Sequence, residues 1–295
     1  MEQATVTLAQ LLERMQVCST AFTSDPKAAS RELERRKAEC YNREEGTLNQ
    51  QDGYNCVLCR NRGKTVELVM EDGEEKAKFF ECSCMNIRRT IARMQRSGRQ
   101  DVLDKYTLDN FRVENSFQRT LKEGALNYLK AGTGWFFIGG QSGCGKSHIG
   151  TAIFRELLLA GKVCQYMAWR EDAPRLKKLL HSEGDEYCTA VDQFKQAQVL
   201  YIDDLFKTGR ESGGRFQRPT VADINLAYEI LNYRADRPKL MTILSSECLL
   251  EQLIDIDEAI GGRIAELSAP FLFSISPDRR KNYRLKGMGG SAAGQ

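Results

Sequence analysis

The sequence predicts an α/β fold built on a parallel sheet, and two observations support this. Short apolar runs typical of buried strands recur through the second half of the chain, at Trp135–Ile138, Val163–Ala168, Val199–Ile202 and Leu240–Leu244. Helical patterns lie between them, such as Ser147–Ala160, which ends before Gly161. Strands that alternate with helices form a parallel sheet with helices on both faces.

The composition is that of a globular protein with enough apolar side chains for a core. Of the 295 residues, 41% are hydrophobic and 28% are charged, and the net charge of +3 is too small to indicate a partner. No apolar run approaches the roughly 18 residues that a membrane helix needs. The N-terminus lacks a basic start followed by an apolar stretch, so we expect a cytoplasmic protein without membrane contact.

The pattern along the chain predicts four regions. Residues 1–50 have amphipathic and charged stretches typical of helices, and residues 51–100 hold paired cysteines followed by a basic linker helix. Residues 101–286 contain the alternating strands and helices. Residues 287–295 are mostly glycine, alanine and serine, and we expect them to be disordered.

Two cysteine pairs predict a structural zinc site. Cys56 and Cys59 are followed, after a gap of 22 residues, by Cys82 and Cys84. Four thiolates suit tetrahedral Zn²⁺, and a site filled by protein ligands stabilises a small module. The alternative is four unliganded thiols. The other cysteines are expected to be ordinary thiols, with Cys40 the only plausible substitute ligand: Cys18, Cys40, Cys144, Cys164, Cys188 and Cys248.

A glycine-rich segment after the first strand of the second half predicts a phosphate-binding loop. It fits G-x-x-x-x-G-K-S with Gly140, Gln141, Ser142, Gly143, Cys144, Gly145, Lys146 and Ser147. Its backbone N–H groups and the start of the next helix favour phosphate oxygens. Lys146 reaches the β- and γ-phosphates of ATP, and the Ser147 hydroxyl binds Mg²⁺. A chance glycine-rich turn is disfavoured by the strand before it and the helix after it.

Two carboxylates at the end of a later strand predict the second half of this site. Asp203 and Asp204 follow the apolar run Val199–Ile202, at the edge where parallel sheets place ligands. Asp203 is expected to bind Mg²⁺ and Asp204 to act as general base for ATP hydrolysis. Aspartate is one methylene shorter than the glutamate common there, so we expect slow or partner-stimulated hydrolysis. The alternative for Asp204 is a helix cap.

Further polar positions are candidates for roles at the γ-phosphate. Ser246 or Glu247, after the strand Leu240–Leu244, is a candidate for sensing the γ-phosphate. Arg263 lies in Gly261–Ile264 and is either an arginine finger for a neighbouring subunit or a surface residue. The two histidines, His148 and His181, have no nucleophile or metal-ligand context.

Two basic clusters suit contacts with nucleic-acid phosphates. The first is the arginine-rich helix at 88–99; its alternative is a solvated helix face. The second spans 279–286, where Tyr283 offers a ring on which a base of single-stranded DNA could stack. Neither cluster contains a base-reading motif.

With these motifs in place, the chain resembles the bacterial and phage replicative-helicase loaders of the DnaC/DnaI type, which are AAA+ ATPases. The resemblance covers most of the chain and rests on the cysteine pairs Cys56/Cys59 and Cys82/Cys84 and on the segments Lys105–Phe111, Gly140–His148, Ile202–Lys207, Ile230–Arg234 and Ser245–Glu247. It implies a P-loop core preceded by a zinc module and N-terminal helices, with His148 beside the nucleotide.

The resemblance also implies a function. Such loaders bind a hexameric replicative helicase through their N-terminal region and deliver it to single-stranded DNA under the control of ATP, as homo-oligomers when ATP is bound. The resemblance assigns the arginine-finger role to Arg263 and the sensor role to Ser246 or Glu247. The family often has asparagine at the position of Glu247. The rival interpretations are a transposition helper ATPase, which is not expected to carry the zinc module, and a switch that holds ATP with little hydrolysis. The sequence does not favour a small-molecule kinase, because it shows no pattern for a second substrate site.

Overall fold

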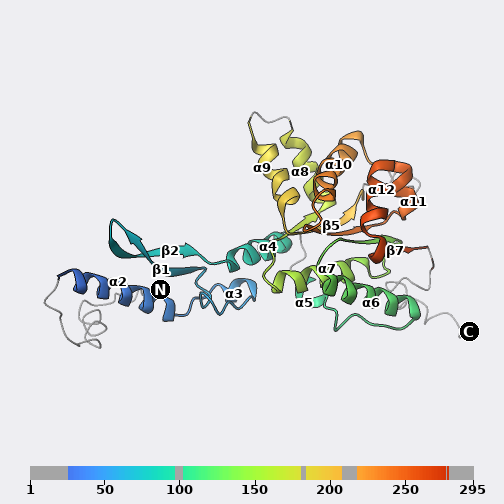
Figure 1. Ribbon diagram of the computed structural model, residues 1–295. Coiled ribbons are helices and arrows are strands. Elements are labelled where there is room, and N and C mark those ends of the chain that lie inside the picture. The colour runs from blue at the N-terminus through green and yellow to red at the C-terminus, as the bar shows by residue number, and fades with distance from the viewer. Residues whose placement is uncertain (1–25, 97–101, 181–183, 208–217, 277, 279–295) are drawn as a thin grey trace, which may run out of the picture. The chain divides into compact units, whose positions relative to one another are not determined.

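The computed structural model describes residues 26–96, 102–180, 184–207, 218–276 and 278 (Figure 1). The chain divides into two compact units, Met1–Cys82 and Ser83–Gln295. The expected helix near the N-terminus, the basic cluster at 279–286 and the tail at 287–295 lie outside the described residues. Within the described ranges, no helix is both long and apolar enough to cross a membrane.

The first unit packs a helix against a two-stranded hairpin. It contains α2 (Pro26–Arg43), α3 (Asn49–Asp52), β1 (Lys64–Glu71) and β2 (Glu74–Glu81). The antiparallel strands turn at Asp72 and Gly73, both with positive φ, which matches the right-handed twist of a hairpin. Asn42 of α2 fixes the helix on β1, because its side chain donates to the carbonyl of Val66 and accepts from the N–H of Val66.

The second unit is a five-stranded sheet with flanking helices, which confirms the predicted α/β class. The strands are β3 (Trp135–Gly140), β4 (Cys164–Ala168), β5 (Val199–Leu205), β6 (Met241–Ser246) and β7 (Leu272–Ile275). They lie in the order β4-β5-β6-β3-β7, and every neighbouring pair is parallel. Strand β7, only four residues long, is not predicted by the sequence pattern.

Helices connect these strands and cover the sheet (Figure 1). They are α4 (Cys84–Arg96), α5 (Val102–Lys105), α6 (Ser116–Ala131), α7 (Lys146–Leu159), α8 (Trp169–Leu179), α9 (Glu186–Gln196), α10 (Val221–Ala235), α11 (Leu250–Ile256) and α12 (Glu258–Leu267), with the short 3₁₀ helix η1 (Ala269–Phe271) before β7.

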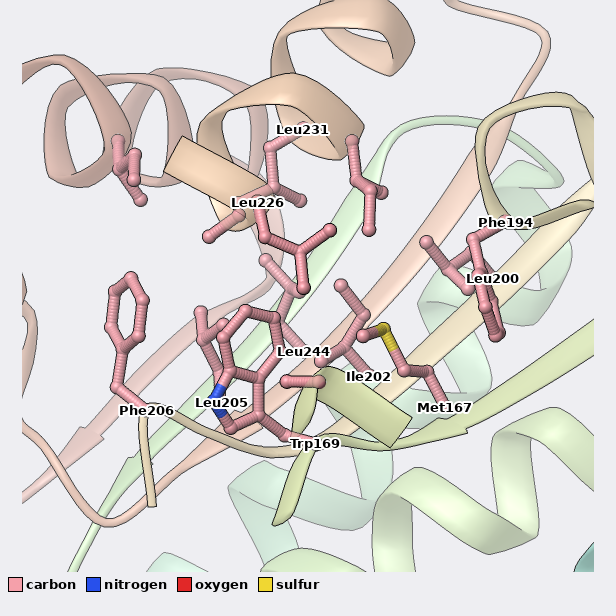
Figure 2. Packing of buried hydrophobic residues seen from close by; sticks show 14 of the residues in the cluster. Met167, Trp169, Phe194, Leu200, Ile202, Leu205, Phe206, Leu226, Leu231 and Leu244 are labelled. Carbon is pink, nitrogen blue, oxygen red and sulfur yellow. The ribbon is translucent and has the colours of Figure 1, made fainter. Parts of the chain in front are cut away.

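The apolar core on one side of the sheet anchors the strand that carries the two acids. Leu200, Ile202 and Leu205 of β5 are fully buried and pack with side chains from α8, α9 and α10 (Figure 2). Trp169 and Phe206 meet edge to face, with ring centroids 5.4 Å apart. Close packing of this kind limits local adjustment, so β5 is a rigid base for Asp203 and Asp204.

Helix α4 lies along β4, the edge strand of the sheet. The Thr90 hydroxyl donates to the carbonyl of Cys164, and Arg93 donates to the side chains of Gln165 and Gln193. Arg88, on the same helix, is buried. Of the arginines on α4 whose side chains are described, only Arg89 is exposed, so the packing engages part of the basic stripe that the sequence predicts.

Arg234 is a fully buried cation that ties α10 to two neighbouring segments. Its guanidinium donates five hydrogen bonds, to the carbonyls of Phe194, Lys195, Ala197 and Met241 and to the hydroxyl of Thr242. Burial lowers its pKa to about 10, which leaves it charged at neutral pH. The planar guanidinium donates hydrogen bonds to carbonyls at the end of α9 and at the start of β6, so one side chain provides donors for both segments.

We expect Arg234→Met to destabilise the second unit by about 3 kcal/mol, because it leaves several buried carbonyls without a donor. Chemical denaturation monitored by circular dichroism measures this loss. Arg175→Met is the matched control, since its parent side chain is 75% exposed on α8. Equal stability of the two variants would contradict the role of Arg234 in holding these segments.

Candidate nucleotide site and cysteine cluster

The loop between β3 and α7 has the backbone that a phosphate site requires. Gly140, Gly143 and Gly145 have φ values of 131°, 81° and 100°, which side-chain-bearing residues rarely adopt. A Cβ on Gly140 would lie 2.3 Å from the carbonyl oxygen of Ile275, so no larger residue fits there. Gly145 caps α7 without a side-chain hydrogen bond, which leaves the helix N-terminus open to an anion.

Lys146 lies inside this loop. Its side chain is buried, and Nζ donates to the carbonyls of Gly140 at 2.7 Å and Gln141 at 2.8 Å. Gln141 itself exchanges two hydrogen bonds with the backbone of Asp278, which holds the start of the loop. The ammonium group is therefore held at the loop by two carbonyls, where it can neutralise phosphate charge.

A cavity of about 710 Å³ opens beside the loop. Ser142, Gly143, Gly145, Lys146 and Ser147 line it from the loop, while Asp204, Lys207 and Glu247 line it from the ends of β5 and β6. The segment Lys105–Arg112 supplies the remaining wall. Cys144 is buried and is not part of the lining.

Part of the cavity wall is aromatic and is formed by Tyr106, Phe111 and His148. The His148 ring stacks on Tyr106 with centroids 4.8 Å apart and meets Phe111 edge to face at 5.1 Å. A ring nitrogen of His148 lies 2.9 Å from the carbonyl of Thr107. Burial lowers the pKa of His148, so the ring is neutral at neutral pH. The cavity thus joins a cationic loop to a flat apolar surface, which suits a nucleotide.

Asp203 is the centre of a hydroxyl network beneath the loop. Its carboxylate accepts hydrogen bonds from Ser245 at 2.5 Å and from Tyr166 and Tyr201 at 3.0 Å each. The Ser147 hydroxyl lies 3.4 Å from the same carboxylate. A hydroxyl and a carboxylate brought together in this way are the oxygen donors that Mg²⁺ takes in nucleotide sites, so the pair fits this ion.

A β-bulge places Asp204 on the cavity. Pairing between β5 and β6 shifts register between Ile202 and Leu205, and Asp204 has a φ of 59°. Bulges of this kind redirect side chains beside active sites. The Ser245 hydroxyl accepts a hydrogen bond from the N–H of Asp204 at 3.0 Å, so it supports both acids.

The candidate sensor residues face different surroundings. Ser246 is buried, donates to the carbonyl of Leu205 and accepts from the N–H of Cys248, and it is not part of the cavity lining. Glu247 lines the cavity, with Oε1 3.0 Å from Nζ of Lys207. The sequence analysis missed Ser245, although its place at the end of a strand, next to the candidate sensor, was the available signal.

Arg263 lies away from this cavity. Residues Gly261–Ile264 are helical, within α12, and the half-buried Arg263 side chain donates to the carbonyl of Ala259. Its guanidinium carbon lies 5.2 Å from the centre of the Tyr228 ring. The side chain is therefore presented at the surface, where another molecule can reach it.

The four paired cysteines meet in one buried cluster. The sulfur atoms of Cys56, Cys59, Cys82 and Cys84 all lie within 4.8 Å of one another, and each residue is at most 6% exposed. Cys56 and Cys82 are 3.7 Å apart at sulfur, against about 3.8 Å expected for two thiolates on tetrahedral zinc.

The backbone around the first cysteine pair also fits a metal site. The N–H of Gly63 points at the sulfur of Cys59 from 3.2 Å, as in a knuckle turn that stabilises a thiolate. Cys40 is exposed and is not part of the cluster, so the predicted set of four is complete without it. The donor set and its spacing are compatible with a structural zinc site.

Comparison with known proteins places the chain in a family. No family model matches the chain. It is similar to the phage-like element PBSX protein XkdC of Bacillus subtilis, with 31% identity over 253 residues that cover 80% of this chain and 88% of XkdC. The uncharacterized protein YqaM of the same organism is 26% identical over 300 residues, covering 86% of this chain and 93% of YqaM.

A more distant similarity reaches a protein of named function. The replicative helicase loader DnaC of Escherichia coli is 24% identical over 143 residues, which are 48% of this chain and 56% of DnaC. The chain belongs to the family of the phage-like element PBSX protein XkdC.

Proposed function

We propose that this chain is an ATP-dependent loader that delivers a hexameric replicative helicase to single-stranded DNA. The observation that carries the proposal is the contact between Ser147 and Asp203, which joins both halves of an ATP site in a chain similar to the helicase loader DnaC. The buried four-cysteine cluster favours a loader over a transposition helper ATPase.

In this proposal ATP occupies the cavity beside the loop. Its phosphates lie on the loop N–H groups and on Lys146, and its base lies toward Tyr106, Phe111 and His148. Ser147 and Asp203 would hold Mg²⁺, which would supply positive charge to offset that of the phosphates. Asp204 takes the proton from the water that attacks the γ-phosphate.

Two further residues take roles at the γ-phosphate. Glu247 is favoured over Ser246 as the sensor, because Glu247 lines the cavity and the Ser246 hydroxyl is engaged with the backbone. Arg263, which lies outside the lining of this cavity, acts as a finger on the ATP of a neighbouring copy, so the chain forms homo-oligomers when ATP is bound. This arrangement makes ATP turnover dependent on assembly.

The zinc ion has a structural role. It is bound by Cys56, Cys59, Cys82 and Cys84, and with all four positions filled by protein it has no open site for catalysis. It orders the small first unit, which then contacts the helicase.

The test is a pull-down from host extract with the tagged, purified chain in ATP or ADP, followed by mass spectrometry. We expect the replicative helicase to be recovered in amounts that depend on the nucleotide. The Lys146→Ala variant is the matched control and is expected to lose that dependence. Recovery of a transposase in place of the helicase would support the transposition helper instead.

A separate measurement decides between a loader that hydrolyses ATP and a switch that only holds it. Asp204→Asn is expected to slow single-turnover hydrolysis at least about 100-fold, because it removes the base. Unchanged hydrolysis in this variant would remove Asp204 from that role.

A further inference from the structure

Lys207 joins two carboxylates at the rim of the nucleotide cavity. Its Nζ lies 2.9 Å from Oδ2 of Asp204 and 3.0 Å from Oε1 of Glu247. The three side chains are 28%, 17% and 9% exposed, in the order Lys207, Asp204, Glu247. Ion pairs that are partly withdrawn from water are screened less than surface pairs, so both contacts restrain the groups they join.

The backbone presents Lys207 to Asp204. The N–H of Lys207 donates to the carbonyl of Asp204 at 2.9 Å, which closes a tight turn after β5. Asp204 and Phe206 both have a φ of 59°, a left-handed conformation that is strained at residues other than glycine. Packing of the buried Phe206 on Trp169 holds the turn in this form.

The ammonium group remains charged in this place. Burial lowers the pKa of Lys207, but the hydrogen bonds and charges of Asp204 and Glu247 outweigh burial and raise the pKa above its ordinary value. Lys207 and Glu247 also line a second cavity of about 210 Å³, whose walls include Arg218 and Asp255. This space gives the Lys207 side chain room to turn away from Asp204 while it stays near Glu247.

The ion pair with Lys207 affects whether Asp204 can act as a general base. A general base needs a free lone pair aimed at the attacking water. Oδ2 of Asp204 accepts a hydrogen bond from Lys207, so one of the two carboxylate oxygens is directed at the ammonium group. Water activation by Asp204 therefore competes with its ion pair to Lys207.

We propose that Lys207 is a positioning residue that restrains Asp204 and keeps ATP hydrolysis slow while the ion pair is intact. Glu247 anchors the ammonium group from the other side. The inference rests on the proposed function, in which Asp204 activates the water. It identifies the Asp204–Lys207 contact as the feature that an activating partner must break.

The test replaces the ammonium group and keeps its hydrocarbon stem. We expect Lys207→Met to raise kcat for ATP hydrolysis about three- to tenfold, the effect of losing an ion pair of this exposure, with KM changed by less than about twofold. Lys207→Arg, which keeps the charge, is expected to retain a kcat near that of the wild type. Fluorescent ATP-analogue binding shows that the variants are folded.

Combination with Asp204→Asn distinguishes restraint from other effects. In that background Lys207→Met is expected to leave kcat unchanged, because the group it releases is gone. A lower or equal kcat for Lys207→Met alone would overturn the proposal, as would an increase that persists with Asp204→Asn. Absence of hydrolysis in the wild type and in every variant would instead overturn the proposed ATPase function.

Discussion

Replacement of Lys146 by alanine is expected to abolish productive ATP turnover, with kcat/KM lowered about 100- to 1,000-fold. The ammonium group lies at 2.7 and 2.8 Å from two loop carbonyls, where the phosphates are expected. Its removal takes away the cation that offsets phosphate charge and leaves the carbonyls of Gly140 and Gln141 facing that charge. The cost therefore exceeds that of one lost hydrogen bond.

Phosphate release measured over a range of ATP concentrations determines this loss, and a fluorescent ATP analogue reports binding separately. Lys178→Ala is the matched control, because Lys178 is exposed on α8 and is not part of the cavity lining. The control is expected to behave as the wild type. Turnover by Lys146→Ala at the wild-type rate would show that the site lies elsewhere.

Loss of the first cysteine pair is expected to release zinc and unfold the first unit. Apparent zinc binding in four-ligand sites contributes about 10–16 kcal/mol, more than a hairpin and one long helix can supply by burial. In the double variant Cys56→Ser, Cys59→Ser, two of the four buried donors no longer form thiolates, so the remaining Cys82 and Cys84 hold the metal poorly.

Elemental analysis of protein purified without chelator measures the metal, and proteolysis with mass spectrometry measures local unfolding. We expect one zinc per wild-type chain, none in the double variant, and new cleavage sites within residues 51–84. The variant Cys40→Ser, Cys188→Ser removes two exposed thiols and is the matched control. Metal-free wild-type protein with an ordered first unit would contradict the zinc site.

The sequence alone predicted those features that depend on short stretches of chain. Buried strands such as Val199–Leu205 appear as apolar runs, and the loop Gly140–Ser147 fits a motif whose spacing is fixed in phosphate-binding loops. The fold class follows from the alternation of strands and helices. The cysteine pairs could be recognised as candidate metal ligands because such ligands recur at set intervals in sequences.

Other features required strands that are distant in sequence to lie side by side. Tyr166 and Ser245 reach Asp203 only because β4, β5 and β6 are neighbours in the sheet. The bulge at Asp204 arises from the pairing of β5 with β6, so the sequence of neither strand alone predicts it. Arg88 belongs to a basic stripe by sequence but is buried, because packing along β4 outweighs the preference of arginine for solvent.

The helix along the outer strand of the sheet has a consequence for self-assembly. An uncovered edge offers unpaired backbone groups to any other chain, but here the Thr90 hydroxyl binds the Cys164 carbonyl and α4 occupies the space beside β4. In the proposed ATP-bound assembly, copies of the chain that meet on that flank therefore do so through side chains and not through a shared sheet. Subunits joined in this way can separate without breaking a main-chain ladder, which favours assemblies that form and dissolve within one round of nucleotide exchange.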